Sequence, residues 1–153
     1  EVAALVRAHR LAEALQKLDL HPFVPELDVA AQILRAQVLE STDAAAAVKL
    51  YTALRERFPN DANVLLRAGV AMFRRRNRTA AEEMLTRSWQ GARIPETAYY
   101  LGRINLAKAD DPAATYYFAE CIALDTEFGE WRNAAYDALL RILKDTRRVS
   151  GQR

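Results

Sequence analysis

Small residues recur along the chain at intervals of 33 or 34 positions, and each is followed four positions later by a large apolar residue. The small residues are Ala14, Ala47, Ala81 and Ala114, and their apolar partners are Leu18, Tyr51, Leu85 and Phe118. Residues four apart lie on one face of a helix, and a small residue lets a second helix approach closely. The pattern therefore predicts a helical repeat.

A second series of small residues runs in step with the first. Gly69, Gly102 and Ala135 follow one another at intervals of 33. Each unit of about 34 residues thus carries two helical segments, with one small residue at the contact of each. We expect the small residues of both series to be buried between helices, namely Ala47, Ala81, Ala114, Gly69 and Gly102.

Prolines and helix-capping residues divide the chain into these segments. We expect a single domain over 1–146 and a flexible basic tail over 147–153. The domain is expected to comprise a leading helix over 2–18, helix pairs over about 26–60, 61–94 and 95–128, and a terminal helix over 129–145. The connecting turns are short, so consecutive helices are expected to be antiparallel neighbours.

Candidate caps place the helices within each pair. Asp43, Asp61 and Asp111 are predicted N-caps, and Thr79 has the spacing of a capping box with Glu82. The predicted helices of the three pairs are 26–41, 43–58, 61–76, 79–91, 95–108 and 111–125.

Composition supports an all-α domain with no dominant charge. Of the 153 residues, 51% are hydrophobic, whereas glycine and proline occur five times each, which favours helix. The net charge of +2 gives no global field for nucleic acid or an anionic membrane. No apolar run predicts a membrane span or a signal peptide, so the compartment stays open between cytoplasm and periplasm. The chain starts without Met inside a helical pattern, which we interpret as part of a longer protein.

The residues at the repeat positions resemble the tetratricopeptide repeat, whose pattern is W-x2-L-G-x2-Y, then A-x3-F, then P. The best copy is Ala98-x2-Leu101-Gly102 followed by Ala114-x3-Phe118. A similar copy combines Leu65-x2-Ala68-Gly69-x2-Met72 with Ala81-x3-Leu85. The chain departs from the pattern at Asn105, where an aromatic residue is usual, and at Arg93 and Thr126, where proline is usual. The resemblance implies an all-α, right-handed solenoid of about three repeats plus flanking helices.

The resemblance also implies a concave groove, lined by the first helix of each repeat, that binds a segment of a partner. Transferred in register, the groove helices are 26–41, 61–76, 95–108 and 129–145. Tyrosine and arginine are favoured at binding hot spots, and Tyr99 and Arg103, like Arg132 and Tyr136, are one turn apart. The predicted partner-binding residues are Phe73, Arg74, Tyr99, Arg103, Arg132 and Tyr136. Other positions on the predicted exposed stripe are Gln32, Ala36, Leu39, Asn63, Leu66, Val70, Glu96, Leu106 and Leu139, of which the aliphatic ones fit the core equally well.

The remaining candidates have structural explanations. The run of arginines from Arg74 to Arg78 is typical of a solvated helix end, with an acidic patch on a partner as the alternative. Cys121 occupies a position that is usually small and apolar, so we expect it to be buried rather than nucleophilic. His9 and His21 lack the carboxylate spacing of a metal site. We therefore expect no metal, no cofactor and no nucleic-acid partner.

Two functional hypotheses follow from these features. The first is a non-catalytic interaction module, that is, an adaptor, a scaffold or a secretion-type chaperone, that binds a segment of another protein and does not insert into a membrane. The alternative is the recognition arm of a larger enzyme, such as a glycosyltransferase or an envelope-polysaccharide machine. No nucleophile, base or phosphate-binding loop with supporting spacing is found in the sequence, so no catalytic activity is expected within it.

Overall fold

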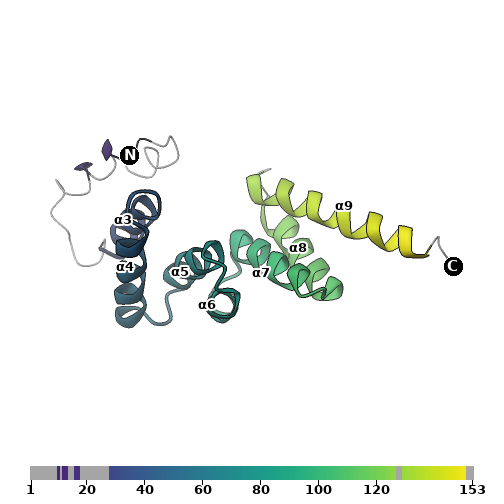
Figure 1. The fold of residues 1–153 in the computed structure, drawn as a ribbon, viewed down its shortest axis with the longest axis horizontal. Helices are drawn as coiled ribbons and strands as arrows, with labels where there is room; N and C mark the ends of the chain where they lie inside the picture. Colours follow the sequence, from purple (N-terminus) through teal and green to yellow (C-terminus); the bar gives the residue numbers. More distant parts are fainter. Residues whose placement is uncertain (1–9, 11, 14–15, 18–27, 127–128, 151–153) are drawn as a thin grey trace.

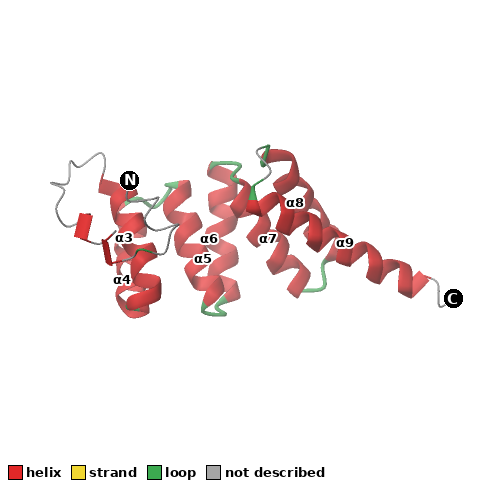
Figure 2. Cartoon of the chain, turned by 90° about the horizontal axis from the view of Figure 1, so that it is seen from above, coloured by secondary structure: helices red, strands yellow, loops and turns green. Residues whose placement is uncertain are grey.

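The computed structural model describes residues 10, 12–13, 16–17, 28–126 and 129–150 (Figure 1). Seven long helices make up most of this part, and no strand occurs among the described residues (Figure 2). The helices are α3 (Asp28–Thr42), α4 (Ala44–Arg57), α5 (Ala62–Arg74), α6 (Arg78–Gly91), α7 (Pro95–Ala107), α8 (Asp111–Leu124) and α9 (Glu130–Ser150). Most of the predicted leading helix over 2–18 lies outside the described residues.

The helices form an elongated row of antiparallel pairs. The pairs are α3 with α4, α5 with α6 and α7 with α8, and α9 packs on α8. Helices two apart in the chain also contact each other: α3 contacts α5, α7 contacts α9, and side chains of α5 contact side chains of α7. The α3–α4 pair and α9 lie at opposite ends of the row, so the helices do not close into a bundle (Figures 1 and 2). This confirms the predicted all-α solenoid of helix pairs.

The small residues of the repeat lie at the helix contacts, as predicted. Ala47, Ala81 and Ala114 are at most 1% exposed. Gly69 and Gly102 are buried as well, and each faces a large side chain of the second helix of its pair. A Cβ atom on Gly102 would lie 2.6 Å from Cε1 of Phe118, and one on Gly69 would lie 2.8 Å from Cγ of Leu85. The helices of a pair thus approach so closely that only glycine fits without a shift.

Two of the predicted caps are confirmed. The Asp43 carboxylate accepts hydrogen bonds from the backbone of the first turn of α4, and Asp61 does the same for α5. Two others are wrong by one or two residues. The cap of α6 is Asn77, which accepts from the Ala80 N–H, instead of Thr79. The cap of α8 is Asp110 instead of Asp111.

The turns that follow α5 and α7 explain these corrections. Arg76 and Ala109 adopt the left-handed conformation, with φ of 62° and 59°. The next residue donates its N–H back to the preceding helix, from Asn77 to the Met72 carbonyl and from Asp110 to the Asn105 carbonyl, both at 3.0 Å. This is the Schellman arrangement. The residue that closes the first helix therefore also caps the second.

Helix α9 is longer than predicted. The expected range was 129–145, followed by an irregular basic tail, but the helix runs from Glu130 to Ser150. No proline or glycine interrupts the chain before Gly151, and arginine is a good helix former. Residues 147–150 are thus helical, and 151–153 lie outside the described residues.

Candidate functional site

The first candidate group lies where α5 faces α7. Tyr99 and Arg103 are one turn apart on α7, and the Arg103 Nη1 donates a hydrogen bond of 3.0 Å to the Tyr99 hydroxyl. The Arg103 guanidinium also lies 5.6 Å from the ring centroid of Phe73 on α5 and 5.7 Å from that of Tyr99. Both distances are within the range of cation–π attraction. The structure thus brings together Phe73, Tyr99 and Arg103, and their aromatic contacts fix the direction of an exposed arginine.

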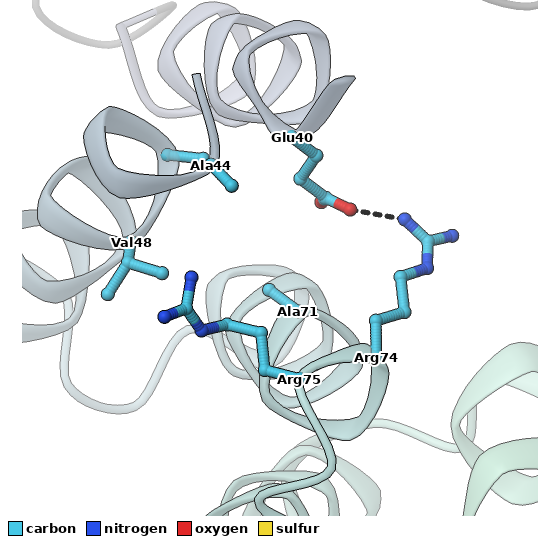
Figure 3. A pocket seen from close by; sticks show the side chains of 7 residues that line it. Glu40, Ala44, Val48, Ala71, Arg74 and Arg75 are labelled. Carbon is cyan, nitrogen blue, oxygen red and sulfur yellow. Dashed lines mark hydrogen bonds and ion pairs between the residues drawn. The ribbon is translucent and has the colours of Figure 1, made fainter. Parts of the chain in front are cut away.

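Arg74 joins this group from the end of α5. Its guanidinium forms an ion pair with the Glu40 carboxylate of α3. Arg74 and the neighbouring Arg75 point to different sides of α5, with Arg74 directed toward Glu40 and Arg75 toward Val48 of α4 (Figure 3). Both arginines line a small pocket of about 80 Å³ between α3, α4 and α5. The two adjacent arginines therefore line this pocket from different sides (Figure 3).

Among the described residues, three larger pockets lie between α3 and α5, between α5, the start of α6 and α7, and between α7 and α9. The first, of about 460 Å³, lies between α3 and α5, where Ile33, Gln37 and Arg67 contribute to its lining. The second, of about 450 Å³, is lined by Phe73, Arg74, Arg76, Arg78, Tyr100 and Arg103. The third, of about 330 Å³, is lined by Tyr99, Arg103, Leu106, Ala134, Asp137, Ala138 and Arg141. We call the residues that line these three pockets the groove face.

Arg132 is not part of the groove face. Its guanidinium donates to the carbonyl oxygens of Ile122 and Asp125 at 3.3 and 3.1 Å, and its backbone N–H donates to the Asp125 carboxylate. These bonds satisfy the carbonyls at the end of α8, which a helix otherwise leaves without partners. The structure therefore gives Arg132 a role in joining α8 to α9.

Tyr136 also lies apart from Tyr99 and Arg103. It is 57% exposed, and the residues of α9 that line the pocket with Tyr99 and Arg103 are Ala134, Asp137, Ala138 and Arg141. Successive residues are about 100° apart around a helix axis, so Tyr136, two residues after Ala134, points to nearly the opposite side of α9. Of the four residues predicted to form a single patch, Tyr99 and Arg103 line this pocket, whereas Arg132 and Tyr136 do not.

Several residues predicted on the exposed stripe are buried instead. Ala36, Leu66 and Val70 are at most 2% exposed and belong to the hydrophobic core. Glu96 is 6% exposed. The reason is that neighbouring pairs pack closely enough to cover these positions, whereas Leu106, at 36% exposed, reaches the surface.

The buried Glu96 is held by a bidentate ion pair. Arg67 of α5 donates to it, with Nη1 to Oε1 and Nη2 to Oε2 both at 2.8 Å. Burial raises the pKa of Glu96 above its ordinary value, although Arg67 acts in the opposite direction. This pair ties α5 to α7, and its Arg67 is itself part of the groove face.

Sequence reasoning missed several groove-face residues. Tyr100 lies in the second pocket, and burial raises the pKa of its hydroxyl, so it stays neutral at physiological pH. Ala134 and Ala138 are small residues one turn apart on α9, a signal that could have indicated the side facing α7. Arg76 and Arg78 also line the second pocket, although the sequence indicates only that they belong to an arginine run at a helix end.

The other chemical candidates have structural roles. Cys121 is fully buried, as predicted, and burial together with the Asp125 carboxylate raises the pKa of its thiol to about 12. A thiol with so high a pKa is a poor nucleophile. Among the described residues, no cluster of three or more His, Cys, Asp or Glu side chains could hold a metal ion. No described helix combines the length and apolar character that crossing a membrane requires.

Comparison with known proteins bears on the fold. No protein-family model matches the chain, and no curated protein sequence matches it significantly. Among solved structures, the crystal structure of MamA is similar, with a TM-score of 0.63 and 12% sequence identity over 98% of this chain and 96% of that chain. This similarity supports the all-helical fold in which the helices pack in adjacent pairs.

Proposed function

We propose that this chain is a non-catalytic interaction scaffold that binds a segment of a partner protein along the groove face. The observation that carries the proposal is a series of three pockets, to which α3, α5, α7 and α9 contribute in turn. Such a series suits an extended segment of a partner protein, because successive side chains of the segment can occupy successive pockets. A single deep cavity would suit a small molecule better.

The chemistry of the groove face supports a protein partner. Phe73 and Tyr99 offer apolar ring surface, and Arg103 links the second and third pockets because it lines both. Aromatic and arginine side chains dominate the binding energy of protein interfaces. The Asn63 and Gln37 amides in the first pocket add hydrogen-bonding groups that can pair with a peptide backbone.

The geometry around Arg103 supports the binding of a partner rather than catalysis. Its guanidinium is positioned by the Tyr99 hydroxyl and by two rings, so it is preorganised to bind an anionic or polar group. The carboxylate of Asp61, which lines the first pocket, is occupied in capping α5.

Site-specific photo-crosslinking tests this proposal. A photoreactive amino acid replaces Leu106 on the groove face in one variant and Ala119, an exposed residue of α8, in a matched control. Both variants are expressed in the source cells, and the crosslinked peptide is sequenced. We expect Leu106 to crosslink one defined segment of a partner, and the synthetic segment to bind the purified chain. Equal crosslinking from both positions, or a segment that does not bind in isolation, would contradict the proposal.

A further inference from the structure

The second pocket carries more positive charge than the protein itself balances. Arg74, Arg76, Arg78 and Arg103 all line it, and no carboxylate does. Arg74 is paired with Glu40 from α3. In the described part of the chain, no acidic side chain forms an ion pair with Arg76, Arg78 or Arg103. Three guanidinium groups thus face an opening whose lining contains no carboxylate. Asp137 lines the third pocket together with Arg103 but forms no ion pair with it.

The backbone holds these arginines on one rim. The left-handed conformation of Arg76 reverses the chain sharply between α5 and α6, so Arg74 and Arg78 lie on either side of the turn and line the same pocket. Arg103 reaches the pocket from α7, where the Tyr99 hydroxyl and the Phe73 ring orient its guanidinium. Fixed guanidinium groups lose little freedom when they bind, and their planar donors match carboxylates.

The rings of the pocket favour a protein segment over nucleic acid. Phe73 and Tyr100 contact each other edge to face, with centroids 5.3 Å apart, and Tyr100 is only 7% exposed. Single-stranded nucleic acid needs open ring faces on which bases stack, together with a basic track along the backbone. Here Tyr100 is buried against Phe73, so the pocket offers one partly exposed ring and no series of ring faces for successive bases, and the net charge of the chain is only +2.

We propose that this pocket binds the carboxylates of an acidic protein segment, with Arg76, Arg78 and Arg103 as the charge partners. The inference rests on the proposed function and names the chemistry of the partner segment. A bound acidic segment neutralises the three arginines and relieves their mutual repulsion. An apolar side chain between the carboxylates would contact the exposed part of Phe73.

Fluorescence polarisation with two labelled peptides tests the inference. One peptide alternates glutamate and leucine, and the other has glutamine in place of every glutamate. We expect the wild-type chain to bind the acidic peptide and not the glutamine peptide at physiological ionic strength. A double variant, Arg76→Gln with Arg78→Gln, is expected to weaken binding of the acidic peptide by about tenfold or more.

Arg75→Gln provides the matched control, because Arg75 belongs to the same arginine run but lines the small pocket toward Val48 instead (Figure 3). It is expected to retain wild-type affinity within about twofold, and circular dichroism verifies that all variants are folded. Any of four results would overturn the inference. The acidic peptide does not bind, or both peptides bind equally. The control and the double variant lose affinity equally, or a labelled oligothymidine binds more tightly than the acidic peptide. If the crosslinked partner segment still binds the double variant with wild-type affinity, the groove assignment stands and the acidic character of the segment is refuted.

Discussion

Gly102 of α7 has no room for a side chain, since the Phe118 ring stands where a Cβ would lie and is itself fully buried. We predict that Gly102→Ala lowers the free energy of unfolding by about 1 to 2 kcal/mol, because overpacking outweighs the better helix propensity of alanine. Gly91→Ala is the control, since the nearest atom to its Cβ is Ala62 Cβ at an ordinary 3.6 Å. Urea denaturation measures both. Equal stability of the two variants would show that the contact between α7 and α8 is looser than described.

A second prediction at the residue scale concerns Glu96. Because burial raises its pKa in the folded chain, the folded state binds this proton more tightly than the unfolded state. The contribution to stability is therefore present at low pH and is lost as the pH rises through the folded-state pKa. We predict that Glu96→Gln gains stability relative to wild type as the pH rises from about 4 to 7.

Denaturation of both proteins across that pH range measures the difference, and the exposed Glu83→Gln serves as the control. The control is expected to follow the wild-type profile. If instead the free energy of unfolding of the wild type rises relative to that of Glu96→Gln toward neutral pH, the ion pair with Arg67 outweighs the cost of burying the charge.

The sequence predicts residues whose environment follows from periodicity alone. Ala81, Ala114 and Gly102 are buried because the repeat phase places them at helix contacts. Periodicity does not predict which residues of α9 belong to the groove face. Their direction depends on how α9 is rotated against α7, and contacts such as that of Trp131 with Tyr99 and the bonds of Arg132 to α8 set this rotation. Ala134 and Ala138 indicate which side of α9 faces α7, but the sequence of α9 alone does not specify these individual contacts.

At the scale of the element, the two Schellman turns place non-glycine residues in the left-handed conformation. Ala109 has φ of 59°, which costs an alanine about 1 kcal/mol or more. We predict that Ala109→Gly raises the free energy of unfolding by about 0.5 to 1 kcal/mol, since glycine relieves this strain at a smaller entropic cost. Ala119→Gly, at an exposed position inside α8, is expected to lower it by about 1 kcal/mol.

Thermal unfolding of the two variants gives the comparison directly. Shifts of the same sign and size would indicate that Ala109 is not held in the left-handed region.

The turns also explain why helix ends were harder to predict than helices. Asn77 and Thr79, like Asp110 and Asp111, are neighbouring residues that can all cap a helix. The turn that closes the preceding helix selects between them, and no proline or glycine marks that turn in the sequence.

At the scale of the whole molecule, the repeat phase and the short turns were sufficient to predict the row of helix pairs. The pockets could not be predicted in the same way, because each lies between elements about one repeat apart in the chain. Their lining depends on side chains that span the gap between α5 and α7, such as Arg67 with Glu96 and Phe73 with Tyr100. The groove face therefore emerges from the packing of repeats and not from any single motif.

Titration calorimetry of the partner segment against groove-face variants tests the central claim most directly. The partner segment is the one identified by crosslinking at Leu106. Tyr99→Ala alters the groove face, and Tyr116→Ala removes an equally large side chain, 48% exposed, from α8. Because Tyr99 also contacts Trp131, Arg103→Ala provides a second groove variant at an exposed position. We predict that each groove variant loses about 2 kcal/mol of binding free energy while remaining folded, whereas Tyr116→Ala binds like the wild type. Wild-type affinity in both groove variants, or an equal loss in Tyr116→Ala, would contradict binding along the groove face.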